Sequence, residues 1–326
     1  MKKRLFGDSG VKVSDVGLGC WQLGGDCWGN IDDQRAYEIL STAIDNGINF
    51  LDTADVYGNG QSELLIGNFL KGCSEEIFVA TKLGRGEMWP DNYNETTVRM
   101  AIEASLKRLG VECLDLIQLH CIPGTVLREG DIFEWLNKLR NEGKIKRFGA
   151  SVESVEEALV CLEQENLSSL QIIFNIFRQK PINELFPKVK KKNVAIIVRL
   201  PLASGLLTGK MRKNQSFPPN DHRYFNRDGQ YFNVGETFAG LPFEIGVELA
   251  DELLQYVPKE MTMSQMALRW ILDYDVVSTV IPGASQPSQV STNALASDLS
   301  NLSSDMHQKF STFYQQRVVK HIRGSY

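Results

Sequence analysis

The feature that most constrains the fold of this chain is the regular alternation of short apolar runs with longer segments of helical periodicity. The apolar runs are rich in Val, Ile, Leu and Phe. Short runs of this kind separated by periodic helices predict a parallel sheet, because parallel strands need crossover connections. Eight such units close a (β/α)8 TIM barrel, and an open doubly wound sheet is the alternative. The eight runs are residues 17–21, 48–52, 77–82, 114–119, 145–151, 170–174, 194–198 and 278–282.

Two segments stand outside this alternation. Residues 4–19 alternate apolar and polar positions around Gly7 and Gly10, which predicts an N-terminal β-hairpin that plugs the bottom of the barrel. Residues 205–243, after the seventh strand, are rich in Gly, Pro, Asn and aromatic residues and show no clear period. A long irregular loop in a compact domain is usually functional, and we expect a lid over the exit of the seventh strand. No linker divides the chain, so residues 1–326 are expected to form one barrel domain.

The segments between the apolar runs carry helix signals. The first is capped by Asp32 or Asp33 and stopped at Gly47. The predicted helices span residues 32–46, 62–71, 95–109, 131–141, 155–165 and 182–192.

Composition excludes several classes of partner. The chain has 326 residues, 43% of them hydrophobic and 23% charged, which describes a globule able to bury a sizeable core. A net charge of −5 argues against nucleic acid, which needs a clustered positive face. No window approaches the ~18 apolar residues of a membrane span, and no secretory signal is present, so we expect a cytoplasmic protein. The six cysteines form no C-x-x-C pair and are expected to be reduced and mostly buried, with no metal site.

Four polar residues lie where predicted strands end: Asp52, Tyr57, Lys82 and His120. The carboxyl ends of barrel strands open on one face, so residues distant in sequence become neighbours there. A phenol ionises near pH ~10, and a cation such as Lys82 would stabilise its phenolate. Asp52 could hold Lys82 charged, and His120 could orient a substrate oxygen. Each residue alone is more often structural, but together they predict a proton-transfer site.

Seven motifs in the same order make the chain resemble the aldo-keto reductases, a family of barrel enzymes that use nicotinamide cofactors. The resemblance implies reduction of aldehydes or ketones by hydride transfer, with Tyr57 as general acid assisted by Lys82, Asp52 and His120. It implies NADP(H) as cofactor, with NAD(H) as the alternative. The motifs are residues 17–25, 49–63, 108–120, 144–151, 201–210 and 280–293, and the segment ending at Lys82.

The cofactor site must be predicted without a G-x-G-x-x-G fingerprint, which this chain lacks after any strand. Barrels often bind phosphate with the loops after strands seven and eight and a helix N-terminus. By resemblance, Ser151 and Gln171 would hold the nicotinamide carboxamide. The residues implied near the pyrophosphate are Leu202, Ser204, Leu206 and Lys210, and those around the adenosine are Gly283, Ser285, Gln289 and Asn293.

The chain departs from the family pattern at three places. Val152 stands where many relatives have Asn, so one carboxamide contact is either missing or supplied by another group. Arg199 replaces an aromatic residue that often stacks on the nicotinamide, and we expect its charge to repel the oxidised ring. Residues 270–308 contain no Lys or Arg to bind an adenosine 2′-phosphate. The cations that could reach it from the lid are Arg212, Arg223 and Arg227.

The substrate is constrained only to a small carbonyl compound. Trp21, Trp28 and Trp89 are the expected pocket walls, which favours an apolar or aromatic substrate. Two other functions remain open. One is a regulatory subunit that binds nucleotide and senses redox state with slow turnover, and the other is an isomerase or lyase that uses Lys82 as a Schiff-base amine. The sequence does not indicate an oligomeric state.

Overall fold

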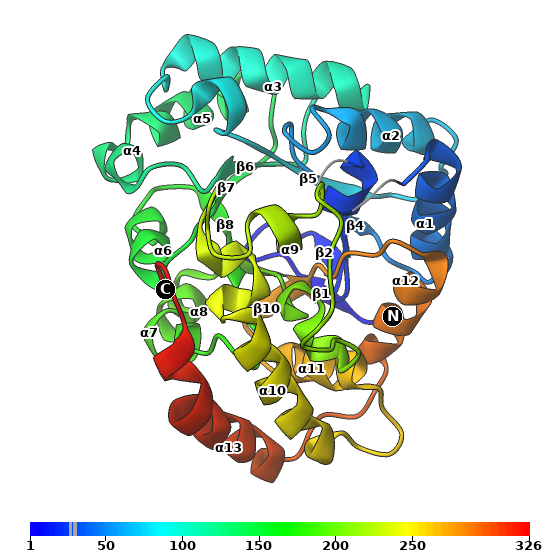
Figure 1. Ribbon diagram of the computed structural model, residues 1–326. Helices are drawn as coiled ribbons and strands as arrows, with labels where there is room; N and C mark the ends of the chain where they lie inside the picture. The colour runs from blue at the N-terminus through cyan, green and yellow to red at the C-terminus, as the bar shows by residue number, and fades with distance from the viewer. Residues whose placement is uncertain (26–27, 29–30) are drawn as a thin grey trace.

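The computed structural model describes residues 1–25, 28 and 31–326, and its centre is a barrel of eight parallel strands (Figure 1). Neighbouring strands pair in chain order, and parallel bridges from Val16 to Val280 and from Gly19 to Gly283 join the first strand region to the last. The closed barrel confirms the prediction and excludes the open sheet. The strands are β3 (Leu18–Gly19), β4 (Phe50–Asp52), β5 (Phe78–Leu83), β6 (Leu116–His120), β7 (Phe148–Ser151), β8 (Leu167–Ile173), β9 (Ala195–Arg199) and β10 (Val277–Val280).

Helices surround the barrel (Figure 1), and capping residues fix several of their ends. The Asp32 side chain accepts a hydrogen bond from the Arg35 amide at the start of the first helix, as predicted. One predicted helix, 182–192, is instead two short helices, because Pro187 lacks an amide proton and cannot continue the first one. The helices are α1 (Asp33–Asp45), α2 (Gln61–Leu70), α3 (Glu95–Leu109), α4 (Gly124–Glu129), α5 (Asp131–Asn141), α6 (Val155–Leu162), α7 (Pro181–Glu184), α8 (Phe186–Lys192), α9 (His222–Phe225), α10 (Phe243–Leu253), α11 (Met263–Leu272), α12 (Pro287–Ala294) and α13 (Ser304–Phe313).

The N-terminal hairpin closes the bottom of the barrel, as the sequence predicts. Strands β1 (Lys3–Leu5) and β2 (Lys12–Ser14) pair antiparallel. The connecting turn carries Phe6, which is fully buried, with ring centroids 5.0 Å from Phe78 and 6.0 Å from Phe50. Because these two phenylalanines begin β4 and β5, the plug lies at the end of the barrel opposite the carboxyl ends of the strands. The hairpin therefore does not cover the face formed by the carboxyl ends of the strands.

The irregular segment 205–243, which we call the lid segment, contains α9 and several short 3₁₀ turns. In Figure 1 it crosses in front of the barrel strands. Its Asp221 forms an antiparallel bridge with Trp28, and its Glu236 forms an ion pair with Arg199 at the end of β9. These contacts hold the segment against the carboxyl ends of the strands, which is where a lid was expected.

Five cysteines lie in the described part of the chain, and all five are free thiols. Cys20, Cys121 and Cys161 are buried, whereas Cys73 and Cys113 are partly exposed. Cys27 lies outside the described residues. No helix in the described ranges has the length and apolar character that crossing a membrane requires.

Candidate active site

The four predicted catalytic residues come together at the carboxyl ends of three adjacent strands. Asp52 ends β4, Lys82 is the next-to-last residue of β5, and His120 ends β6. Tyr57 lies in the loop between β4 and α2, which turns its ring back over the barrel. Parallel pairing of β4 with β5 and of β5 with β6 places these exits side by side. The strand-exit argument from the sequence therefore describes the observed arrangement.

Lys82 is the centre of the hydrogen-bond network. Its Nζ donates to Asp52 Oδ1 at 2.5 Å, to the Thr53 carbonyl oxygen at 2.7 Å and to the Tyr57 hydroxyl at 3.2 Å. The side chain is fully buried, and although burial lowers the pKa of Lys82, Asp52 and Tyr57 outweigh this and raise the pKa above its usual value. An ammonium with an acceptor for each of its three protons is a poor Schiff-base amine.

Asp52 is held in place by two amides. Gln171 Nε2 donates to Asp52 Oδ2 at 2.7 Å, and Gln118 Nε2 donates to the same oxygen at 3.2 Å. The other carboxylate oxygen is left for Lys82. Gln171 was implied as a carboxamide contact, and in the structure its amide protons are used by Asp52 and by Gln118 Oε1. Gln118 was not predicted.

Tyr57 carries its proton at neutral pH. Its ring stacks on Trp21 with centroids 5.7 Å apart and meets the His120 ring edge-on at 5.7 Å. Burial raises the pKa of Tyr57 to about 12, and the nearby Lys82 ammonium opposes this rise. The Lys82 cation acts on the phenol pKa in the expected direction, but desolvation has the larger effect. A protonated phenol that touches a cation is suited to donate a proton.

His120 is neutral. Burial lowers the pKa of its imidazole well below the usual value, and the positive charges of Lys82, Arg85 and Arg199 lower it further. Its Nδ1 atom is buried and has no hydrogen-bond partner among the described residues. A neutral imidazole keeps one nitrogen as a donor, which can hold a substrate oxygen.

A cavity of about 650 Å³ opens beside these residues. Asp52, Tyr57 and His120 line it, whereas Lys82 lies behind them. Ten of the residues implied at the cofactor line the same cavity: Ser151, Gln171, Arg199, Leu202, Ser204, Lys210, Gly283, Ser285, Gln289 and Asn293.

Two residues with predicted contacts do not line the cavity. The side chain of Leu206 is fully buried and packs where Gly246 of α10 leaves room for it, so it does not line the cavity. Trp89 is 45% exposed and also lies outside the cavity lining, with the Arg85 guanidinium above its ring. Trp21 and Trp28 are in the cavity wall, as expected.

The segments after β9 and β10 form part of the cavity wall. After β9, Ser204 and Gly205 adopt positive φ angles of 54° and 102°, and both residues line the cavity. After β10, the N-terminal end of α12 contributes Ser288 and Gln289 to the lining, and Gln289 Oε1 accepts from the Ser285 amide at 2.7 Å. A helix N-terminus with nearby hydroxyls favours an anionic group.

Of the three lid arginines, only Arg223 lines the cavity. Its guanidinium binds Asp221 through Nε at 2.9 Å and through a second nitrogen at 2.6 Å. Arg212 donates to backbone carbonyls, and Arg227 pairs with Glu244. One lid arginine, Arg223, therefore lines the cavity, and Asp221 is already its counter-ion.

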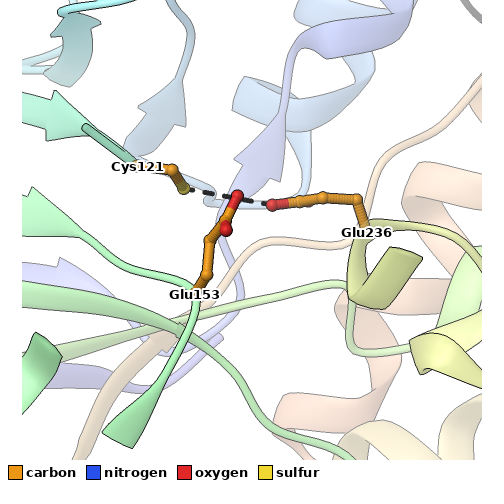
Figure 2. A group of neighbouring side chains, drawn as sticks. All are labelled: Cys121, Glu153 and Glu236. Carbon is orange, nitrogen blue, oxygen red and sulfur yellow. Dashed lines mark hydrogen bonds between the residues drawn. The ribbon is translucent and has the colours of Figure 1, made fainter. Parts of the chain in front are cut away.

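A second cluster of charged groups surrounds Cys121, next to His120. Figure 2 shows Cys121, Glu153 and Glu236 converging from the end of β6, the loop after β7 and the lid segment. Their ligand-type atoms lie within 4.8 Å of one another. Each carboxylate is ion-paired: Glu153 with Arg85 at 3.2 Å, and Glu236 with Arg199. We call these five residues the mouth cluster.

Sequence reasoning missed most of the mouth cluster. Arg85, Cys121 and Glu153 follow the ends of β5, β6 and β7 by a few residues, so the strand-end rule that identified the predicted catalytic residues could also have identified them. No sequence pattern indicated that Glu236 would lie at the cavity, because it belongs to a segment without periodicity. Arg199 was identified, but its counter-ion was not.

The fold and site can be compared with known proteins. The family model described as the aldo/keto reductase family matches residues 15–315. The chain is 30% identical to the aldo-keto reductase YhdN of Bacillus subtilis, over 89% of this chain and 87% of that protein. It is 29% identical to the NADH-specific methylglyoxal reductase of Escherichia coli, over 93% and 95%. The solved glycerol dehydrogenase AKR11B4 from Gluconobacter oxydans superposes with a TM-score of 0.79 at 30% identity, covering 99% of this chain and 98% of that one. This chain belongs to the aldo/keto reductase family.

Proposed function

We propose that this protein reduces aldehydes or ketones to alcohols with NADP(H) as cofactor and accepts NAD(H) less well. The observation that carries the proposal is the contact of the protonated Tyr57 hydroxyl with the Lys82 ammonium at 3.2 Å, beside a neutral His120 in one cavity. A general acid next to a cation and an oxygen-orienting donor is the arrangement that carbonyl reduction needs. Two relatives are named for small substrates, methylglyoxal and glycerol.

The residues divide the work as follows. When bound, reduced nicotinamide supplies the hydride that adds to the carbonyl carbon. Tyr57 donates its proton to the carbonyl oxygen, and Lys82 stabilises the negative charge left on the phenol oxygen. His120 orients the carbonyl oxygen toward Tyr57. Asp52 keeps Lys82 in place, and in the reverse direction Tyr57 accepts the proton from the alcohol.

The cavity lining supports a nicotinamide dinucleotide. Ser151 and Gln171, at the ends of β7 and in β8, present a hydroxyl and an amide oxygen suited to a carboxamide. Lys210 and the N-terminal end of α12 suit the anionic phosphates. The substrate would lie against Trp21 and Trp28, which form the aromatic part of the wall.

The test is NADPH oxidation with a panel of aldehydes, sugars and quinones, for the wild-type protein and for Tyr57→Phe. We expect turnover with at least one reactive aldehyde. In the variant, turnover should fall by about 10²-fold or more while NADPH affinity stays nearly the same, because only the proton donor is lost. Most of the activity surviving in Tyr57→Phe would remove Tyr57 from the mechanism. Tight NADPH binding with very slow wild-type turnover would favour the regulatory subunit.

A further inference from the structure

We propose that Glu236 is a specificity-determining residue: by neutralising Arg199 in the cavity wall, it allows the site to bind the oxidised, positively charged nicotinamide. This inference rests on the proposed function, because it concerns the redox form of the same cofactor. It replaces the expectation that the charge of Arg199 repels the oxidised ring.

The charge of Arg199 is compensated by groups of the protein itself. One of its terminal nitrogens is ion-paired with Glu236, and the other donates to the Val152 carbonyl oxygen at 3.0 Å and contacts Cys121 Sγ at 3.6 Å. Arg199 is 8% exposed, and both partners of the ion pair line the cavity. The guanidinium is thus fixed beside the reaction space, with its counter-ion also at the cavity surface.

The mouth cluster as a whole is electrically balanced. Arg85 and Arg199 bring two positive charges, and Glu153 and Glu236 bring two negative charges. The cluster also acts on the catalytic residues: after burial, the largest cause, Glu236 contributes to the raised pKa of Tyr57, and Arg199 contributes to the lowered pKa of His120. Because Arg199 and Glu236 line the same cavity as Tyr57, a nicotinamide positioned to react at Tyr57 lies within the field of both charges.

The charge of the nicotinamide changes during the reaction, from neutral when reduced to positive when oxidised. With Glu236 in place, the nearest arginine is compensated and the field at the ring does not strongly penalise the oxidised form. Removing the carboxylate charge leaves a buried guanidinium uncompensated, and repulsion at a low effective dielectric is strong. Glu236 is contributed by the lid segment, so this compensation depends on the lid lying over the barrel.

The test measures dissociation constants of NADP⁺ and NADPH separately, by calorimetry, and compares their ratio between variants. Glu236→Gln keeps the size of the side chain but removes its charge, so we expect weaker NADP⁺ binding. The dissociation constant of NADP⁺ divided by that of NADPH should rise by about tenfold or more. Arg199→Met leaves Glu236 as the uncompensated group and should lower the ratio below the wild-type value. Combining the two changes should bring the ratio back toward the wild-type value.

The matched control is Glu153→Gln, which removes the other carboxylate of the mouth cluster from a position outside the cavity lining. Its ratio should change less than that of Glu236→Gln. Equal loss of both redox forms in Glu236→Gln, with no opposite change in Arg199→Met, would show that Glu236 only anchors the lid and would overturn the inference. Failure of the wild-type protein to bind either dinucleotide would instead contradict the proposed function.

Discussion

At the scale of single residues, the four proposed catalytic residues combine one buried ion pair, Lys82 with Asp52, and two groups that are neutral at physiological pH, Tyr57 and His120. Lys82 and Asp52 are 0% and 2% exposed, and their charges are satisfied by one another and by neighbouring amides and a carbonyl. Burial then keeps the proton on Tyr57 and off His120. Burial therefore has two effects at neighbouring positions: it keeps Tyr57 protonated, as a general acid must be, and it keeps His120 neutral, as a hydrogen-bond donor.

Lys82→Met tests how the ammonium acts on Tyr57. The pKa of Tyr57 is about 12 with Lys82 opposing the effect of burial, so loss of the cation should raise this pKa further. We expect a lower rate of carbonyl reduction and an alkaline limb of the pH–rate profile that moves upward. An active variant whose profile matches the wild type would mean that Lys82 only supports the structure.

Asp55 offers a test of stability. Burial, and then the neighbouring Glu63, raise the pKa of Asp55 to about 7, and its Oδ1 has no partner in the described part of the chain. Because the folded pKa lies above the ordinary value, the protonated acid stabilises the fold at low pH, and this contribution is lost as the pH rises through about 7.

Asp55→Asn should therefore be more stable than the wild type at alkaline pH. We expect its advantage in unfolding free energy to grow by about 2–3 kcal/mol between about pH 5 and pH 8, measured by urea denaturation. An advantage that does not depend on pH would show that Asp55 does not titrate in this range.

At the scale of secondary-structure elements, the barrel depends on close approach between β7 and β8. Gly149 lies within β7, and a Cβ atom there would come 2.1 Å from Ser169 Oγ and 2.6 Å from the Ser169 carbonyl oxygen. The strand register shifts at this point, between Phe148 and Gly149. A glycine inside a strand often marks such a bulge or close contact.

Gly149→Ala should destabilise the fold by about 3 kcal/mol or more, because backbone of β8 would have to move. Gly72→Ala is the matched control, since the nearest atom to its added Cβ is the Phe69 carbonyl oxygen at 3.9 Å. That change should alter stability by less than about 1 kcal/mol. Similar chemical denaturation curves for the two variants would contradict the close packing of β7 on β8.

At the scale of the whole molecule, most cations at the mouth of the barrel are already paired with carboxylates. Arg85, Arg199 and Arg223 line the cavity, and each has a counter-ion. Lys210 also lines the cavity and forms no ion pair within the described ranges. The surplus of positive charge available to an extra phosphate is therefore small.

We accordingly expect a modest preference for NADPH over NADH, about tenfold in kcat/KM, because a phosphate must compete with Asp221 for Arg223. Arg223→Gln should reduce the preference further. Arg212→Gln, a lid arginine outside the cavity lining, is the control and should leave it unchanged. A very large preference that persists in Arg212, Arg223 and Arg227 variants would place the phosphate site elsewhere.

The sequence by itself determined the barrel, its plug and the position of the four proposed catalytic residues. The strands and helices can be predicted from local information, because the spacing of apolar residues within a short segment indicates its secondary structure. The site can be placed because all strands of a parallel barrel have their carboxyl ends on one face. Asp52, Lys82 and His120 could be placed because each lies at a strand end. The lid segment was recognised by its lack of period.

Only the tertiary structure decided which groups meet across the mouth of the barrel and how they titrate. Glu236 reaches Arg199 from an irregular segment, and Leu206 turns toward α10 because Gly246 leaves space there. The pKa of Tyr57 rises because burial outweighs the Lys82 charge. Side-chain direction, counter-ions and desolvation depend on the spatial distances between segments that are far apart in the sequence. The periodicity of the sequence carries no information about those distances.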